Sequence, residues 1–266
     1  MATPAQIASA GTYITDVGIE VTDGSVVRVQ IGLLPSGQYG LRAVAADGTT
    51  VIINTALTPT VTGFAHGYTS TSFTIPSGAT GEMLLCATAW PFSAGTPPTW
   101  PSGWTLLGSI QNIGAIDNYC GIWYKVTDGT EGSSVYPTQV TGGPPKMPYH
   151  MYRISQYAGV PATSGWAGNA SSGDTSSDPP SLTPGFGAVQ TLWLPFLCWG
   201  SLFRTVTGYP SGYTDAQADN TDGVNTGPGI ASARKFSTAA TEDPSVFTTS
   251  AGGSWQAAVT IAISSI

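Results

Sequence analysis

The chain of 266 residues is long enough to bury a substantial core, and 41% of it is hydrophobic while only 9% is charged. A formal net charge of −7, with only eight Lys and Arg, leaves no basic patch for a phosphate backbone, so nucleic acid is not an expected partner. No apolar run approaches the roughly 20 residues of a membrane helix, so we expect no membrane insertion.

The first 67 residues predict a small β-meander followed by a linker. Ser25–Ile31 alternates apolar and polar residues as a half-buried strand does, and the dipeptide Asp47-Gly48 is a strong hairpin signal. Thr55–Gly67, which has a proline between threonines, is interpreted as the linker. Because a sheet this small cannot bury both of its faces, we expect residues 1–67 to form an anchor that docks on a neighbouring subunit or on a symmetry mate.

Residues 68–266 predict a jelly-roll-like antiparallel β-sandwich, so that the whole chain is expected to be all-β. Apolar residues rarely recur at helical spacing, and Val, Ile, Thr and aromatic residues dominate the strand-like segments. Stretches such as Ser72–Ile75 and Met83–Trp90 follow one another at intervals of about 8 to 12 residues, with Gly and Pro between them, as in sandwich domains.

Two similar turns indicate that the sandwich is built from two related halves. WPSGWT begins at Trp100 and YPSGYT begins at Tyr209, so their prolines lie 109 positions apart (210 − 101). Further pairs follow in the same order: Leu85-Cys86 with Leu197-Cys198, and Lys125 with Lys235. We therefore predict an internal pseudo-repeat with halves at about 68–163 and 177–266.

We expect the conformation of each of these turns to be stabilised by the proline, glycine and aromatic residues within it. We assign the proline to the second position of the turn, where its ring fixes φ, and the glycine to a later position with positive φ. The aromatic rings on either side are interpreted as packing against the turn rather than as contacting a ligand.

The polar segment Ser164–Pro180 is predicted to be a loop between the two halves. It contains Trp166, which lies outside the repeated pattern and is the best candidate for contact with a ligand, because an exposed indole beside polar groups suits a sugar. The alternative is that Trp166 folds back as a lid on the seam between the halves.

A second polar segment, Asp215–Gly229, is also predicted to be a loop. Its Asp215, Asp219 and Asp222 have oxygen ligands suitable for calcium, but they lack the spacing of a calcium loop. These residues are weak metal candidates, a solvated acidic loop is the favoured interpretation, and no cofactor is expected.

The sequence does not predict an enzyme. His66, in the expected linker, and His150, at the start of a strand, belong to no recognisable hydrolase or metalloprotease motif, and the glutamates form no recognisable glycosidase pair. His150 is interpreted as a satisfied, partly buried histidine rather than as a general base. The three cysteines, Cys86, Cys120 and Cys198, are odd in number and lack metal-site spacing, so we expect buried free thiols.

The chain resembles a β-sandwich module frequent in phage tail and fibre proteins. The resemblance is carried by the order STSFTIPSG, MLLCATAW, PPTWPSGWTLLG, GIWYKVT, MYRISQYAGV, YPSGYT and GGSWQAAVTIAI. LPSGQYGLRAVAADGTTVI, near the amino terminus, similarly resembles hairpin modules of minor tail proteins from tailed phages of actinobacteria. The chain departs from the module where two prolines precede a strand, at residues 146–150, and at Pro195.

The resemblance implies a non-enzymatic structural protein of a tailed-phage virion, most of all a minor tail or tail-tip protein with a host-attachment role. The implied partners are other virion subunits, further copies of the chain with a trimer favoured, and a glycan of the host surface. A capsid decoration protein or head fibre is the alternative within virions, and a carbohydrate-binding module is the alternative outside them. Residues 1–6 lack the features of a signal peptide, so we expect assembly in the host cytoplasm.

Overall fold

The computed structural model describes residues 10–15, 18–23, 26–33, 39–44, 50–53, 57–69, 71–91, 98–112, 118–138, 147–169, 174–200, 204–220, 228–250 and 255–265. The chain divides into two compact units, Met1–Leu57 with Ile266, and Thr58–Ser265. The ordered elements are strands in antiparallel sheets, and the described residues contain no helix, so the predicted all-β class is confirmed.

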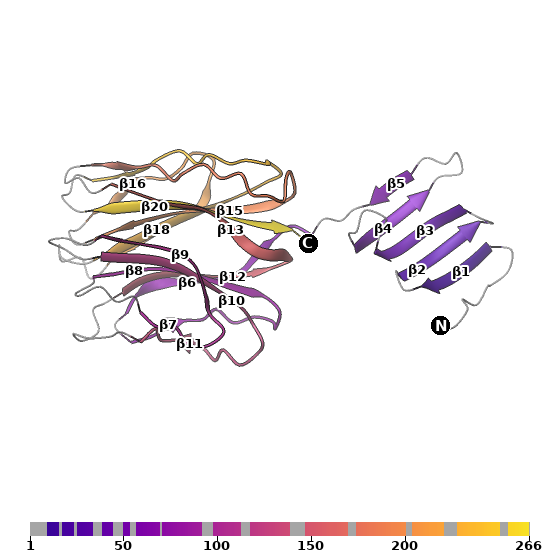
Figure 1. Ribbon diagram of the computed structural model, residues 1–266, viewed down its shortest axis with the longest axis horizontal. Helices are drawn as coiled ribbons and strands as arrows, with labels where there is room; N and C mark the ends of the chain where they lie inside the picture. The colour runs from indigo at the N-terminus through magenta and orange to yellow at the C-terminus, as the bar shows by residue number, and fades with distance from the viewer. Residues whose placement is uncertain are drawn as a thin grey trace. The chain divides into compact units, whose positions relative to one another are not determined.

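The first unit contains one five-stranded antiparallel sheet in sequential order (Figure 1). Its strands are β1 (Ala10–Thr15), β2 (Gly18–Asp23), β3 (Val26–Leu33), β4 (Tyr39–Val44) and β5 (Thr50–Ile53). This is the predicted meander. All of its strands neighbour each other in sequence, as hairpin-connected strands do.

The register of this sheet gathers apolar residues on one face. One row across all five strands is Ile14, Ile19, Ile31, Leu41 and Ile53, and a second row is Thr12, Val21, Val29, Ala43 and Val51. The row between them is Tyr13, Glu20, Gln30, Arg42 and Ile52. Because successive residues of a strand face opposite sides, the two apolar rows share one face and the more polar row belongs to the other.

The second unit is a sandwich of two main sheets, each with a short outer sheet (Figure 1). The first main sheet contains β6 (Thr60–Thr69), β8 (Met83–Pro91), β9 (Thr105–Asn112), β10 (Asn118–Val126) and β12 (Met147–Ser155). The second contains β13 (Tyr157–Asn169), β15 (Thr191–Trp199), β17 (Thr214–Asn220), β18 (Gly229–Ser237) and β20 (Gln256–Ser265). The short sheets pair β7 (Phe73–Thr74) with β11 (Ser134–Val135), and β19 (Phe247–Thr249) with both β14 (Ser176–Ser177) and β16 (Val206–Gly208).

The two main sheets repeat one topology. Their strand orders are β6-β12-β8-β10-β9 and β13-β20-β15-β18-β17, which correspond position by position. The expected sandwich and its internal repeat are confirmed, but each half builds one complete sheet, at 60–155 and 157–265, so the expected boundaries at 68–163 and 177–266 are shifted. A jelly-roll-like arrangement is not confirmed, because each main sheet takes all its strands from one half.

Strand pairing fixes which residues are equivalent in the two halves. Lys125 lies opposite Leu84, and Lys235 lies opposite Trp193. Counting from these pairs, Cys86 corresponds to Pro195 rather than to Cys198, so the sequence alignment of the two Leu-Cys pairs is wrong. The error exchanges the two faces of a strand, since Cys86 packs in an outer cluster whereas Cys198 belongs to the inner core.

The two six-residue turns that suggested the repeat occupy equivalent corners. The N–H of Trp104 donates to the carbonyl of Pro101 over 3.4 Å, and that of Tyr213 donates to the carbonyl of Pro210 over 3.3 Å. Proline is therefore first in each turn rather than second. The third residues, Gly103 and Gly212, have φ of 86° and 78°, which only glycine adopts readily.

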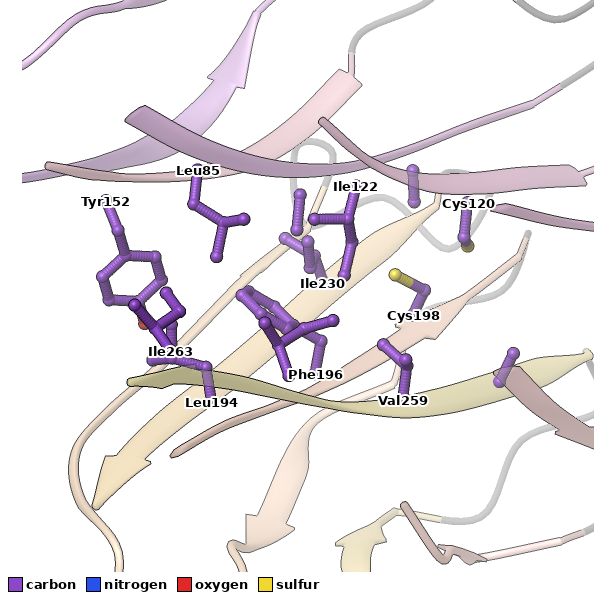
Figure 2. Packing of buried hydrophobic residues seen from close by; sticks show 14 of the residues in the cluster. Leu85, Cys120, Ile122, Tyr152, Leu194, Phe196, Cys198, Ile230, Val259 and Ile263 are labelled. Atoms are coloured by element: carbon purple, nitrogen blue, oxygen red, sulfur yellow. The ribbon is translucent and has the colours of Figure 1, made fainter. Parts of the chain in front are cut away.

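The main core lies between the two sheets. Figure 2 shows Leu85, Ile122 and Tyr152 of the first sheet pointing toward Leu194, Phe196 and Ile263 of the second. Each fully buried aliphatic or phenyl side chain contributes roughly 1.5–3 kcal/mol to folding. Cys86, Cys120 and Cys198 are free and buried, as predicted.

Several expected loops are edge strands. The expected linker Thr55–Gly67 is wrong from Thr60 onward, because β6 pairs with β12 along its length. The first part of Ser164–Pro180 belongs to β13, and the first part of Asp215–Gly229 belongs to β17. These segments are rich in glycine and small polar residues, a composition that predicts loops rather than strands. Gly63 is required where it lies, since a Cβ there would approach Cβ of Pro76 to 2.7 Å.

Pro195 interrupts the pairing of its strand, β15, with one neighbouring strand but not with the other. Pro195 lies within β15 and is paired with Thr260 of β20 in an unbroken register. In the pairing of β15 with β18, Trp193 and Phe196 have partners, but Leu194 and Pro195 between them have none. This interruption is what the missing N–H of proline predicts.

Candidate functional site

A cluster of five polar side chains lies where one edge of the first sheet meets one edge of the second. His66 comes from β6, His150 and Tyr152 from β12, Asp219 from β17 and Ser232 from β18. Three of them, His150, Tyr152 and Ser232, are buried, with 0%, 2% and 0% exposure. We call this cluster the polar seam.

The polar seam is a continuous hydrogen-bonded network. Oδ2 of Asp219 lies 2.8 Å from Nδ1 of His66 and 3.0 Å from Nε2 of His150. On the other side of the His150 ring, Nδ1 lies 2.6 Å from Oγ of Ser232, which lies 2.6 Å from the hydroxyl of Tyr152. Nε2 of Gln217 also donates to Oδ2 of Asp219 over 3.2 Å.

One direction of donation satisfies the buried part of this network with a neutral His150. Tyr152 donates to Ser232, Ser232 donates to Nδ1 of His150, and Nε2–H of His150 donates to the carboxylate of Asp219. Burial lowers the pKa of His150 below its ordinary value of 6.5, and the nearby Asp219 only partly opposes this effect. The neutral imidazole is therefore the form that the fold accommodates.

Two influences compete on the carboxyl group of Asp219. Burial alone would raise its pKa, but hydrogen bonds and charge interactions with His150 and His66 outweigh burial and lower the pKa from 3.8. The ring of Phe64 completes the site by stacking on His66 at a centroid distance of 5.1 Å and by meeting His150 edge-on at 5.5 Å.

Ser232, His150 and Asp219 are the residue types of a hydrolase triad, but their setting is different. A nucleophilic serine must reach a substrate carbonyl. Ser232 and His150 have no exposed surface, and the Ser232 hydroxyl already has two partners, Tyr152 and His150. In this arrangement the three residues bind one another across the sandwich, and a substrate could meet Ser232 only after the sheets rearranged.

Sequence reasoning found one half of this site. The sequence predicts a satisfied, partly buried histidine at His150, and the structure shows it fully buried with hydrogen bonds at both ring nitrogens. The sequence predicts a linker at His66 and does not indicate its contact with Asp219. The signal that could have found it is the pairing of β6 with β12, which puts His66 directly opposite His150.

The three candidate metal ligands do not lie together. Asp219 belongs to the polar seam, whereas Asp215 accepts a hydrogen bond from Nε of Arg234 over 2.7 Å. Asp222 lies outside the described residues. Within the described ranges, no group of three or more His, Cys, Asp or Glu is arranged to hold a metal ion.

Trp166 lies on β13, opposite Val259 of β20, rather than in a loop. Its half-buried ring packs against the main core together with Ile110. A Cβ added at Gly108 would lie 3.7 Å from the indole Nε1, so the indole lies over this glycine of β9. The position matches the lid on the seam that was the alternative to contact with a ligand.

Strand register makes Trp166 the equivalent of His66. His66 lies opposite His150 on β12, and Trp166 lies opposite Val259, which occupies the place of His150 in the second half. By the same correspondence Ile110 replaces Asp219 and Ile122 replaces Ser232. We call the group formed by Trp166, Val259, Ile110 and Ile122 the apolar seam. The two opposite edges of the sandwich are thus closed by different chemistry.

Three glutamates of the second unit are each paired with a separate cation. Glu82 accepts from Nε of Arg153 over 2.5 Å, Glu131 lies 3.4 Å from Nζ of Lys125, and Glu242 accepts from Nζ of Lys235 over 2.8 Å. The two lysines are equivalent in the repeat, so each half holds one Lys-Glu pair near its proline turn. Glycoside hydrolysis uses two carboxyl groups that face each other across the substrate. Here each of these three carboxylates is paired with a cation instead.

Comparison of the chain with protein-family models, with curated proteins and with solved structures gives no match. In the part of the chain that the structure describes, no helix is long and apolar enough to cross a membrane.

Proposed function

We propose that this chain is a non-enzymatic structural protein of a tailed-phage virion, and specifically a minor tail or tail-tip protein with a role in host attachment. The sequence motifs that resemble phage tail and fibre modules support the context. The observation that carries an assembly role is the apolar face of the first unit.

That face contains two apolar rows across five strands, including Ile14, Ile31 and Ile53 in one row and Val21 and Val29 in the other. A single sheet needs a second layer over its apolar face, because apolar surface of this extent favours association wherever it is not covered. Other virion subunits or further copies of the chain supply that layer, and a trimer would also present several attachment surfaces at once.

The sandwich suits the role of a rigid carrier. Its core is formed between two sheets of its own, and the buried Arg153 and Glu82 pair with each other within the unit. Loops held on such a scaffold are where attachment surfaces usually lie. A host-surface glycan is the ligand class we propose for them.

Immunolabelling tests the proposal. Antibodies against the second unit are applied to virions from the host that carries this gene, and the particles are imaged in negative stain. Label at the tail tip or fibres supports the proposal. Label on the head would make the chain a decoration protein or head fibre, and virions that carry no label would rule out the virion assignment and favour a carbohydrate-binding module.

A further inference from the structure

We propose that the polar seam is an acid-labile clasp: proton uptake releases β6 from β17 at one edge of the sandwich, while the apolar seam holds the opposite edge closed. The inference does not depend on the virion assignment, because it rests only on contacts within the second unit.

The clasp joins the outermost strands of the two sheets. His66 on β6 contacts Asp219 on β17 at 2.8 Å, and both strands are at the ends of their sheets. One strand further in, His150 on β12 contacts Ser232 on β18 at 2.6 Å. These contacts between the two sheets therefore involve the carboxylate of Asp219 or the imidazole of His150.

The network has no place for a second proton on His150. A protonated Nδ1 must donate to Ser232, whose oxygen can accept this bond as well as the one from Tyr152. The bond between Ser232 and Tyr152 can run in either direction, so one of their two hydroxyl hydrogens is then left without an acceptor in this buried network, which is unfavourable. Protonation of Asp219 would likewise weaken the bonds from three donors, His66, His150 and Gln217.

Each element around His150 contributes known groups. His66 faces it from β6, Asp219 from β17, and Ser232 from β18, where Arg234 lies two residues further along and pairs with Asp215 of β17. Tyr152 lies on the same strand as His150, and the residue opposite His150 on β8 is Ala87. Among the described residues, Asp219 is thus the one carboxylate that binds the ring directly, and it does not overcome the effect of burial.

The direction of the pH effect follows from linkage. In the closed state the pKa of His150 is lowered from 6.5, whereas an opened edge lets the imidazole titrate normally. Open molecules therefore bind more protons below pH 6.5, and acid favours opening. The lowered pKa of Asp219 adds a second loss of stability below about pH 4. The apolar seam has no titratable side chain among Trp166, Val259, Ile110 and Ile122.

Amide hydrogen exchange on the full chain compares the two seams in one molecule. Between pH 7.5 and pH 5.5, after correction for intrinsic exchange rates, we expect protection in β6 and β17 to fall about tenfold, which is the effect of one proton taken up with a pKa of 6.5. Protection in β9 and β13, at the apolar seam, should stay unchanged. Equal losses at both seams, or no loss at either, would overturn the proposal.

The two histidines also allow a direct readout, since the chain has no others. The His150 ring should keep its neutral NMR signature to lower pH than a free imidazole, and the His150→Gln variant should lose the difference between the seams. The matched Trp166→Phe variant should keep that difference. If His150→Gln does not fold, the wild-type comparison still decides, and a His150 that titrates near pH 6.5 while β6 stays protected would contradict the clasp.

Discussion

His66 and Trp166 occupy equivalent positions in the two halves of the sandwich, and each closes one edge of it. His66 does so by contacting Asp219 at 2.8 Å, and Trp166 does so by packing over Gly108 and beside Ile110. A duplicated fold has therefore kept its topology while the side chains at the two seams diverged from apolar contacts to a polar network, or in the opposite direction. The difference makes the two edges separately testable.

Trp166→Ala should destabilise the second unit by about 2 to 4 kcal/mol, because it removes a large ring from the apolar seam and leaves a cavity. Urea unfolding followed by circular dichroism measures the loss, and Trp166→Phe is the control with a smaller effect. An alanine variant of unchanged stability that no longer attaches to the host would instead identify Trp166 as a ligand contact.

Gly103→Ala and Gly212→Ala should each cost about 1 kcal/mol, because both glycines have positive φ at the proline turns. The two losses should add, since the turns belong to different halves of the chain. Gly185→Ala is the matched control, because a Cβ there would meet nothing within 4 Å and its φ is not positive. A control that loses as much stability as the turn variants would contradict this account.

Glu82→Gln should destabilise the fold by about 3 kcal/mol at neutral pH, because it leaves the buried guanidinium of Arg153 without its counter-charge. Burial alone would raise the pKa of Glu82, but hydrogen bonds with Arg153, Thr62 and Ala79 and the charge of Arg153 outweigh burial, and the pKa is lowered from 4.5. The carboxylate therefore stabilises the fold above about pH 4.5, and this contribution is lost as pH falls through the lowered pKa. The variant should show a flatter dependence of melting temperature on pH below 5 than the wild type.

Full-length protein should associate, whereas a shortened chain that begins at Thr58 should fold as a monomer, because the apolar sheet face belongs to the first unit. Multi-angle light scattering measures both masses. If both chains are monomeric and melt at the same temperature, the anchor function of residues 1–57 is wrong.

The three thiols should react with a thiol reagent only after unfolding. Cys86, Cys120 and Cys198 are buried, and burial raises the pKa of the Cys86 and Cys120 thiols well above the ordinary value, which disfavours the reactive thiolate. Rapid labelling of the native protein, at a rate independent of added urea, would show that the sandwich opens far more easily than its core implies.

The sequence alone was sufficient for the class of fold, the meander, the buried cysteines and the repeat, because these depend on local patterns. Alternation marks a strand whose one face is buried, and the glycines of the two proline turns mark corners that need positive φ. Edge strands were harder to find. β6 and β13 contain glycines and few large apolar residues, since only part of an edge strand is covered, and this composition predicts a linker and a loop instead.

The seams were decided only by the tertiary structure. His66 and Asp219 are 153 residues apart in sequence, and no local pattern links them. They meet because each lies on the outermost strand of its sheet and the two sheets face each other, so their contact depends on strand order and register together. A shift of one residue in either edge strand would turn the side chain to the other face and remove the network, which is why the sequence could name the histidines but could not place them.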